Sequence, residues 1–348
     1  MKTIGVIGTA KNTGKTTTLS FLMKGFFSRE VPVGLTGIGY DGEDVDNITN
    51  LPKPRLFLEE NTFAATSEKC LITSGADYEL IAETGLQTAL GKISLVRITK
   101  PGLMVIAGPN TKEGLAEVTD LFRNKTSAGL LLVDGSLNRL SPMYILEKLI
   151  FTTGASRDTN ISGLAAEMSF IEKVFGFKLN TDIPDGKELS IKVKSSEGET
   201  ALDTYSLVDE DDLALLINQL NDKTEKVYLP GLFSHRFLGK NLMKIFERIR
   251  KPAEFVFNSP VQLLLTDESA NLSFLLSQFA KNNISISYRY KPELSAITIN
   301  PFYPNIKNYS YEAAYINKDE FLHQMTQALH TPVFNIYEPG ADKIFNLL

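Results

Sequence analysis

Apolar and polar positions along the first half of the chain switch repeatedly between two periods, one typical of buried strands and one of amphipathic helices. The run 3–8 is short and apolar, and the apolar residues after it recur at helical spacing in a helix that opens near Lys15. Those helical positions are Leu19, Leu22, Met23 and Phe26. The order of strand, turn and amphipathic helix predicts the start of a parallel βαβ unit.

The same alternation continues to the end of the chain. Further β-like runs lie at 33–38, 92–98, 103–107, 129–133 and 148–152, and in the second half at 227–229, 255–257, 262–265, 284–290, 297–299 and 333–336. Helical patterns lie at 78–83, 112–123, 161–175, 236–249, 270–280 and 318–329. We therefore expect an α/β fold built on a doubly wound, mostly parallel sheet, followed by a second α/β half.

The pattern weakens once, and this divides the chain into three stretches. Residues 1–178 form the first α/β domain, and 226–348 form a second α/β region. Between them, 179–225 begins with a segment rich in Asp, Lys, Gly and Ser, which suits a boundary or a small excursion of exposed strands. The pattern leaves open whether the second region extends the first sheet or forms its own.

Composition narrows the class of protein. Of the 348 residues 43% are apolar and 22% charged, as in an ordinary soluble globular protein. A net charge of −5 argues against an extended nucleic-acid surface, which needs clustered positive charge. A lone cysteine, Cys70, forms neither an intrachain disulfide nor a cysteine metal cage, so we expect a reducing, cytoplasmic setting. No apolar run approaches the ~20 residues of a membrane span, and no signal core opens the chain, so we expect no export and no membrane insertion.

The segment between the first strand and the first helix has the chemistry of a phosphate-binding loop. Gly8 and Gly14 let backbone N–H groups approach phosphates closely, and the helix start adds a favourable dipole. Lys15 supplies a positive charge to the outer phosphates, and Thr16 offers a hydroxyl to Mg²⁺. The predicted nucleotide-contacting residues are Gly8, Thr9, Asn12, Thr13, Gly14, Lys15, Thr16 and Thr17. The sheet is therefore expected to be of the P-loop NTPase type.

The loop departs from the usual pattern in one respect. G-x-x-x-x-G-K-[ST] places its first glycine where Thr9 stands, and the glycine of this chain, Gly8, comes one residue earlier. The alternative interpretation is a glycine turn that merely joins strand to helix. That alternative does not explain the Lys-Thr-Thr sequence at 15–17, so a Mg²⁺-nucleotide site is the prediction.

Acidic residues follow two of the predicted strands. The apolar run 129–133 ends in Asp134, which we predict to be the Walker B carboxylate and a metal ligand, although any buried strand can end in a turn-forming Asp. The strand 33–38 is followed by Asp41 and Glu43, of which Asp41 is the candidate for Mg²⁺. Arg139 is placed to reach a γ-phosphate, but an exposed loop arginine is the simpler interpretation.

The sequence gives little indication of which nucleotide base, adenine or guanine, the site would bind. The nearest relative of the guanine-reading Asn-Lys-x-Asp is 124–127, which lacks the acid and follows a helix, so ATP is preferred over GTP and GTP is not excluded. Ala155 and Asn300 mark two strand ends where a base-recognition loop can lie, and the segment 297–301 resembles the strand end that touches adenine in dethiobiotin synthetase. An Asn followed by Pro is also a common turn opener. The three histidines are scattered and predict no catalytic triad.

Short stretches of the loop resemble two known families. Gly8-Thr9 with 14–16 is similar to dethiobiotin synthetase, and 11–17 resembles the GTP-binding accessory protein of molybdopterin-dinucleotide synthesis. Both resemblances imply the dimerising P-loop class related to nitrogenase iron protein. This implies a homodimer in which Lys11 acts catalytically across the interface, although the class carries that lysine at the position of Ala10 here.

A longer resemblance covers most of the first 160 residues. Its segments are 6–18, 39–43, 51–54, 107–110, 133–139 with 142–143, and 153–156. Together they resemble the ATP-binding subunit of the lysine 5,6-aminomutase reactivase. That family implies an ATPase that acts with a MutS-like ATPase subunit to restore an adenosylcobalamin-dependent aminomutase. The alternatives are a carboxylate-activating ligase of the dethiobiotin synthetase type, a nucleotide-binding accessory protein for cofactor biosynthesis, and a scaffold without turnover.

Overall fold

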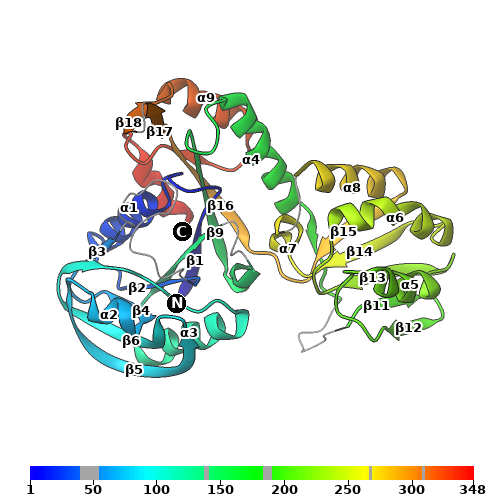
Figure 1. Cartoon of the computed structure of the whole chain (residues 1–348), viewed down its shortest axis with the longest axis horizontal. Coiled ribbons are helices and arrows are strands. Elements are labelled where there is room, and N and C mark those ends of the chain that lie inside the picture. The colour runs from blue at the N-terminus through cyan, green and yellow to red at the C-terminus, as the bar shows by residue number, and fades with distance from the viewer. Residues whose placement is uncertain (40–54, 137–140, 183–189, 266–268, 308–309) are drawn as a thin grey trace. The chain divides into compact units, whose positions relative to one another are not determined.

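The computed structural model describes residues 1–39, 55–136, 141–182, 190–265, 269–307 and 310–348. The chain folds into two compact units. The first is made of Met1–Glu172 together with Pro292–Leu348, and the second is Lys173–Lys291. These limits differ from those expected at 178 and 226, because the last part of the chain returns to the first unit (Figure 1).

The first unit is built on one large sheet. Its nine strands run in the order β19-β16-β9-β1-β8-β2-β4-β6-β5. Neighbours from β19 to β4 are parallel, and only β6 and β5 at one edge are antiparallel, so the sheet is mostly parallel as expected. The strands are β1 Lys2–Gly8, β2 Val33–Gly37, β4 Phe63–Ser67, β5 Asp77–Thr88, β6 Gly91–Lys100, β8 Leu130–Ser136, β9 Lys148–Gly154, β16 Glu293–Asn300 and β19 Val333–Phe334.

Helices cover both faces of this sheet because side chains alternate along each strand. In β2, Leu35 shares an apolar cluster with Leu19 and Leu22 of α1. The adjacent Gly34 faces Phe122 of α3 on the other side. The main helices of this unit are α1 Lys15–Phe27, α3 Lys112–Lys125, α4 Ile161–Phe175, which ends in the second unit, and α9 Lys318–Ala328.

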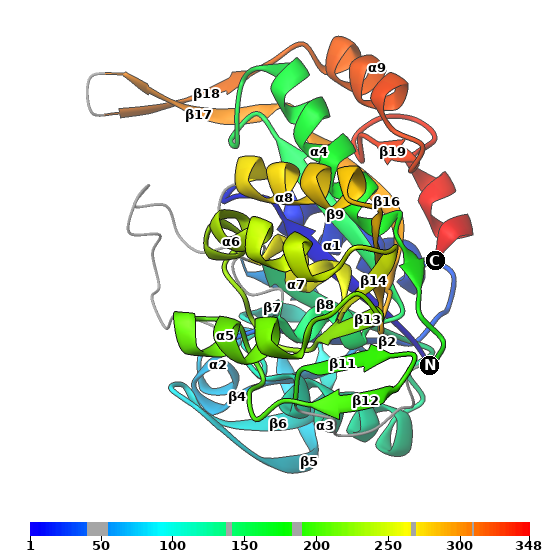
Figure 2. The same ribbon diagram turned by 90° about the vertical axis from the view of Figure 1, so that its right-hand side faces the viewer.

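Smaller elements complete the first unit. They are α2 Glu68–Ile72, the antiparallel pair β3 Leu56–Leu58 and β7 Gly102–Met104, the 3₁₀ helices η2 Ser141–Ile145 and η3 Ala341–Leu347, and the ribbon of β17 Phe302–Lys307 and β18 Ser310–Tyr315. Figure 2 shows this ribbon standing out beyond α4 and α9. The ribbon follows directly on β16, so its base lies at the carboxyl end of a sheet strand.

The second unit has a six-stranded sheet of its own, in the order β10-β15-β14-β13-β11-β12. Its strands are β10 Lys178–Leu179, β11 Lys192–Ser195, β12 Gly198–Ala201, β13 Thr224–Leu229, β14 Ala253–Phe257 and β15 Ile284–Tyr288. Its helices are α5 Glu210–Gln219, α6 His235–Arg248, α7 Pro260–Leu264 and α8 Ser269–Lys281. Phe255 of β14 packs on Phe279 of α8 with ring centroids 4.9 Å apart. The sequence left open whether the second half of the chain extends the first sheet or forms its own. The structure shows both: β13 to β15 belong to a separate sheet, and β16 and β19 extend the first.

Two elements expected from the sequence are wrong. The pattern at 78–83 predicted a helix, but these residues lie in β5, an edge strand that pairs along its length with β6. Its Glu, Leu and Ala residues favour a helix locally, and pairing with a partner strand overrides that preference. The run 262–265 predicted a strand, but α7 occupies it, because Ser259 caps the N-terminus and Pro260 takes the first turn.

Charged residues on β13 and β14 make the second unit sensitive to acid. The Lys226 ammonium lies 3.2 Å from Glu254 Oε2, and Asn180 Nδ2 donates to the same oxygen at 3.2 Å. Burial alone raises the pKa of Glu254, but the neighbouring Ser287 hydroxyl, Lys226 and Asn180 outweigh it, so the pKa lies below its ordinary 4.5. The ionised carboxylate therefore stabilises the fold above about pH 4.5, and this contribution is lost as the pH falls through the lowered pKa.

We expect Glu254→Gln to lower the free energy of unfolding at pH 7 by about 2 kcal/mol, because it removes hydrogen bonds to a charged group. The variant should also lose less stability than the wild type between pH 5 and pH 3. Urea unfolding followed by circular dichroism at several pH values measures both effects. Glu225→Gln, an exposed neighbour on β13, is the control. Equal acid sensitivity of Glu254→Gln and the wild type would contradict the assignment.

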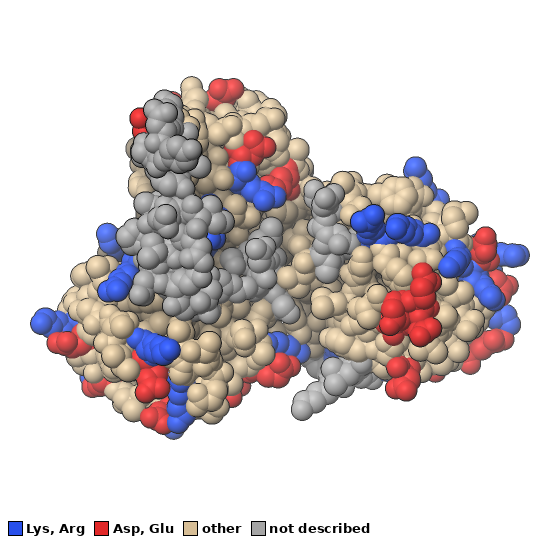
Figure 3. Space-filling view, in the orientation of Figure 1, with Lys and Arg blue, Asp and Glu red and all other residues tan. Residues whose placement is uncertain are grey.

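The surface of the first unit carries mixed charge. On the face drawn in Figure 3, acidic and basic side chains of the described residues lie close together over this unit, with no continuous basic stripe. In the part of the chain that the structure describes, no helix has both the length and the apolar character needed to cross a bilayer.

Candidate functional site

The loop between β1 and α1 has the backbone geometry of an anion site. Gly14 precedes the helix with φ 95° and ψ 11°, a left-handed conformation that favours glycine. The first N–H with an acceptor at the helix start is that of Thr18, which donates to the Gly14 carbonyl at 2.8 Å. The amides of 15–17 precede it and have no acceptor within the helix, so they are available to a ligand at the positive end of the helix dipole.

Two threonines tie the loop to the neighbouring strand β9. The Thr9 amide donates to the Thr152 carbonyl at 3.0 Å, and its hydroxyl donates to that of Thr153 at 3.2 Å. The Thr13 hydroxyl donates to the Ala10 carbonyl at 2.9 Å and lies 3.3 Å from the Thr152 hydroxyl. Both side chains are buried, so the hydroxyls of Thr9 and Thr13 hold the loop in shape and leave ligand contact to the loop backbone.

Lys15 and Asp134 come together as the sequence led us to expect. Asp134 lies on β8, in register with Val6 of β1 on one side and Gly37 of β2 on the other. The Lys15 ammonium lies 2.7 Å from Asp134 Oδ1. That oxygen is buried, and beyond this ion pair it has no hydrogen-bond donor among the described residues. Parallel strands end at the same edge of a sheet, which is why a carboxylate at residue 134 reaches a loop at residue 15.

Asn300 at the end of β16 braces the loop from the other side. A Cβ on Gly14 would lie 3.0 Å from Asn300 Cβ, so the two residues are in close contact. Asn300 Nδ2 donates to the Asn12 carbonyl at 3.0 Å, and Oδ1 accepts from the Phe302 amide at 3.2 Å. The Ser156 hydroxyl lies 3.1 Å from the carbonyl oxygens of both Asn12 and Phe302. Both ends of the Asn300 amide thus bond to the chain itself.

This bracing by Asn300 and Ser156 is the part of the site that sequence reasoning missed. The strand end at Asn300 lies beside the loop at Gly14, as a base contact requires, and that contact stays a prediction; in the fold the Asn300 amide joins the loop to the base of the β17–β18 ribbon. Asn300 and Asn12 are separated by 288 residues, and no local pattern reports a contact over that distance.

The remaining predicted residues lie in varied positions. Lys11 and Asn12 are exposed at the tip of the loop, and Thr16 and Thr17 are half-buried in the first turn of α1. The Ala155 amide donates to the Asn300 carbonyl at 2.9 Å, beside the loop. Three further predictions, Asp41, Glu43 and Arg139, fall outside the described residues.

The described residues hold no ready-made metal cage, since none of their His, Cys, Asp and Glu side chains form a group of three. A Mg²⁺ ion at a nucleotide site needs few protein ligands, because phosphate oxygens and water complete most of the octahedral shell. The protein donors that fit such an ion are the Thr16 hydroxyl and the buried Oδ1 of Asp134.

We expect Asn300→Ala to weaken Mg²⁺-ATP binding about fivefold, because the loop loses one hydrogen bond, worth about 1 kcal/mol, and its packing against Gly14. Isothermal titration calorimetry measures the dissociation constant. Asn124→Ala, on an exposed position near the end of α3, is the control and should leave it unchanged. An unaltered affinity in Asn300→Ala would show that the contact does not shape the loop.

Comparison with known proteins adds little to this geometry. No known protein family matches the sequence, and no curated protein matches it. A solved structure described as pNOB8 ParA bound to nonspecific DNA is 12% identical, with a TM-score of 0.24, and the match covers 81% of this chain and 97% of that chain. A similarity at this TM-score supports no conclusion about fold, ligand or partner. The function is therefore argued from the geometry of the loop.

Proposed function

We propose that this chain binds Mg²⁺-ATP at the loop between β1 and α1 and hydrolyses it. The observation that carries the proposal is the 2.7 Å pair of Lys15 and Asp134 at the start of a helix whose first amides are available to a ligand. A cation, a carboxylate with one buried oxygen and a row of N–H groups in one place are what a triphosphate with a divalent metal requires.

The residues of the loop have separate tasks in this proposal. The amides of the loop and of 15–17 hold the β- and γ-phosphates, and the Lys15 ammonium moves from Asp134 to the outer phosphate oxygens. Thr16 and Asp134 would hold Mg²⁺, which would supply positive charge where negative charge develops on the transferred phosphoryl group. Asn300, Thr9 and Thr13 keep the backbone donors in position before the nucleotide arrives.

ATP is preferred because the one stretch resembling a guanine-recognition motif is in the wrong place. Residues 124–127 lie at the end of α3 and before the start of β8, which is the amino-terminal edge of the sheet. The phosphate loop follows the carboxyl end of β1, which runs parallel to β8, so the two lie at opposite edges. Calorimetry with Mg²⁺-ATP, Mg²⁺-GTP and metal-free ATP tests the proposal, and the absence of binding by all three would reject it.

The finer proposal is that the nucleotide cycle drives a partner protein, specifically an adenosylcobalamin-dependent aminomutase, with a MutS-like ATPase subunit. Its support is the sequence resemblance to the lysine 5,6-aminomutase reactivase, together with a second unit that has its own sheet. A homodimer that places Lys11 at a neighbour's phosphates belongs to the same proposal.

The test is to incubate the protein with ATP, Mg²⁺, fresh adenosylcobalamin, the ATPase partner and an inactivated aminomutase. We expect aminomutase activity to recover only with ATP and not with Lys15→Ala. Failure with every component verified active, together with ADP release triggered by a carboxylate metabolite, would instead favour a ligase. Failure of this test leaves Mg²⁺-ATP binding, measured separately, unaffected.

A further inference from the structure

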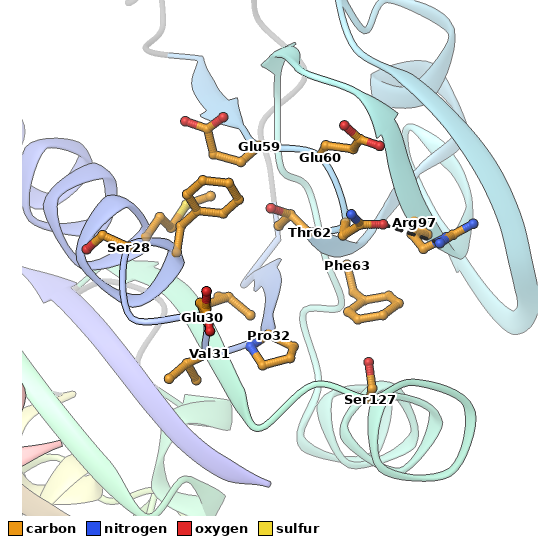
Figure 4. A pocket seen from close by; sticks show the side chains of 14 residues that line it. Ser28, Glu30, Val31, Pro32, Glu59, Glu60, Thr62, Phe63, Arg97 and Ser127 are labelled. Atoms are coloured by element: carbon orange, nitrogen blue, oxygen red, sulfur yellow. Dashed lines mark hydrogen bonds between the residues drawn. The ribbon is translucent and has the colours of Figure 1, made fainter.

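The cavity of about 540 Å³ in the first unit is in the wrong place for the base of a nucleotide whose phosphates lie at the loop (Figure 4). It is bordered by the end of α1 and by the starts of β2 and β4. The phosphate loop follows the carboxyl end of β1, and β1, β2 and β4 all run in the same direction. The cavity therefore lies at the opposite edge of the sheet, and the base has to lie at the carboxyl edge, beside the loop.

The order of the strands indicates the direction in which a nucleotide extends from the loop. Lys15 and Asp134 mark the place of the outer phosphates and the metal, and Asp134 lies on β8, on one side of β1. On the other side of β1 lie β9 and then β16. A nucleoside that extends away from the metal passes over the end of β9 and reaches the end of β16, which is two strand spacings, or about 10 Å, from β1.

The residues that follow β16 are close to the loop and carry aromatic rings. The Ser156 hydroxyl, just after the end of β9, lies 3.1 Å from the carbonyl oxygens of both Asn12 and Phe302, so one side chain spans the distance from the loop to the first residue of β17. Phe302 pairs with Tyr315 of β18, and the centroids of their rings are 5.7 Å apart at an interplanar angle of 64°. This ring pair lies at the base of the projecting ribbon (Figure 2).

The ring of Tyr315 faces solvent on a backbone that is held relative to the loop. Tyr315 is 67% exposed, and Phe302 is half-buried beside it. The Phe302 amide donates to Asn300 Oδ1 at 3.2 Å, and its carbonyl accepts from the Ser156 hydroxyl at 3.1 Å. An exposed ring that is fixed in this way offers a flat apolar surface, on which a nucleotide base can stack.

Hydrogen bonds within the chain limit directional recognition at this strand end. The Asn300 amide bonds to the Asn12 carbonyl through Nδ2 and to the Phe302 amide through Oδ1, and the Asn300 carbonyl accepts from the Ala155 amide at 2.9 Å. The ring surface of Tyr315 carries no such bond across its face. Stacking is therefore the main means by which the end of β16 can hold a base, and it favours the larger purine over a pyrimidine.

We propose that the exposed face of Tyr315, backed by the ring of Phe302, is the platform on which the base of the bound nucleotide stacks. The proposal rests on the binding of Mg²⁺-ATP proposed above and adds the residue that holds the base. The outer phosphates lie at Lys15, the ribose lies over the end of β9, and the base covers the ring. Tyr315 is thus a binding residue, and the chemistry at the phosphates does not involve it.

The test titrates Mg²⁺-ATP, Mg²⁺-UTP and Mg²⁺-tripolyphosphate into the full chain by calorimetry. In Tyr315→Thr, which keeps a residue that favours strands, ATP affinity should fall by about fivefold or more, because the base loses its stacking partner. The loss should be smaller for UTP, and tripolyphosphate, which has no base, should bind as it does to the wild type. An equal loss for ATP and tripolyphosphate, or no loss for ATP, would overturn the proposal.

Two further variants separate stacking from a general effect on the fold. Tyr315→Phe keeps the ring and should bind ATP as the wild type does. Tyr78→Thr removes a tyrosine that is 38% exposed on β5, the edge strand farthest from β16, and should leave all three affinities unchanged. Circular dichroism checks that each variant is folded. If the wild type binds neither ATP nor tripolyphosphate, the nucleotide site itself is rejected; if both bind and Tyr315→Thr keeps its ATP affinity, only the stacking platform is rejected.

Discussion

Replacing Lys15 by alanine is expected to abolish Mg²⁺-ATP binding, with a loss of affinity of at least about 100-fold. The variant loses the cation that faces the outer phosphates, and it also leaves the Asp134 carboxylate, 2.7 Å away in the wild type, without its partner. A negative group then faces a negative ligand. Calorimetry with Mg²⁺-ATP and with Mg²⁺-GTP measures the effect.

The protein should remain folded in Lys15→Ala, because the side chains of Lys15 and Asp134 are 28% and 22% exposed and the pair is partly solvated. Circular dichroism checks this. Lys24→Ala, an exposed position in the last turn of the same helix, is the matched control and should bind normally. Unchanged nucleotide affinity in Lys15→Ala would remove the phosphate-loop assignment altogether.

The second large effect is expected for Asp134→Asn, in which hydrolysis should fall by about 100- to 1,000-fold while folding persists. The amide keeps the size of the side chain on β8 but loses the charge that supports the metal as the transition state forms. ATP binding should fall much less than turnover, because the Lys15 ammonium and the loop amides remain. Single-turnover measurement of phosphate release separates the two quantities.

Asp120→Asn, on the exposed face of α3, is the control for Asp134→Asn. The double variant of Lys15 and Asp134 adds a further test. If the two residues act at one metal-phosphate centre, their effects on turnover should be far from additive. Turnover at the wild-type rate in Asp134→Asn, or strictly additive effects, would take Asp134 out of the site.

Local chemistry was sufficient to predict the first elements of this fold. Gly14 adopts a left-handed conformation, and the helix that begins at Lys15 carries apolar residues at helical spacing. Both features depend only on the residues of one short segment. The contact of Lys15 with Asp134 was also predictable, because an apolar run ending in Asp forms a parallel strand whose carboxyl end meets the loop. Each of these inferences needs only neighbouring residues or the common direction of parallel strands.

Other elements depended on partners far away in the sequence. The residues of β5 prefer a helix in isolation, and only pairing with β6 makes them a strand. The hydrophobic pattern also did not predict the limits of the two units. β16 and β19 belong to the second half of the sequence, but they pair with strands of the first sheet. Strand periodicity reports which residues are buried and does not report which sheet a strand joins.

The sequence by itself therefore predicted the glycine loop before α1, the lysine and threonine at the start of that helix, the acidic strand end and the α/β class, all of which follow from local spacing and turn chemistry. Only the tertiary structure decided that Asn300 and Ser156 brace the Asn12 carbonyl. These contacts join segments that no periodic pattern links, since they arise when the packed sheet brings distant strand ends to a common edge.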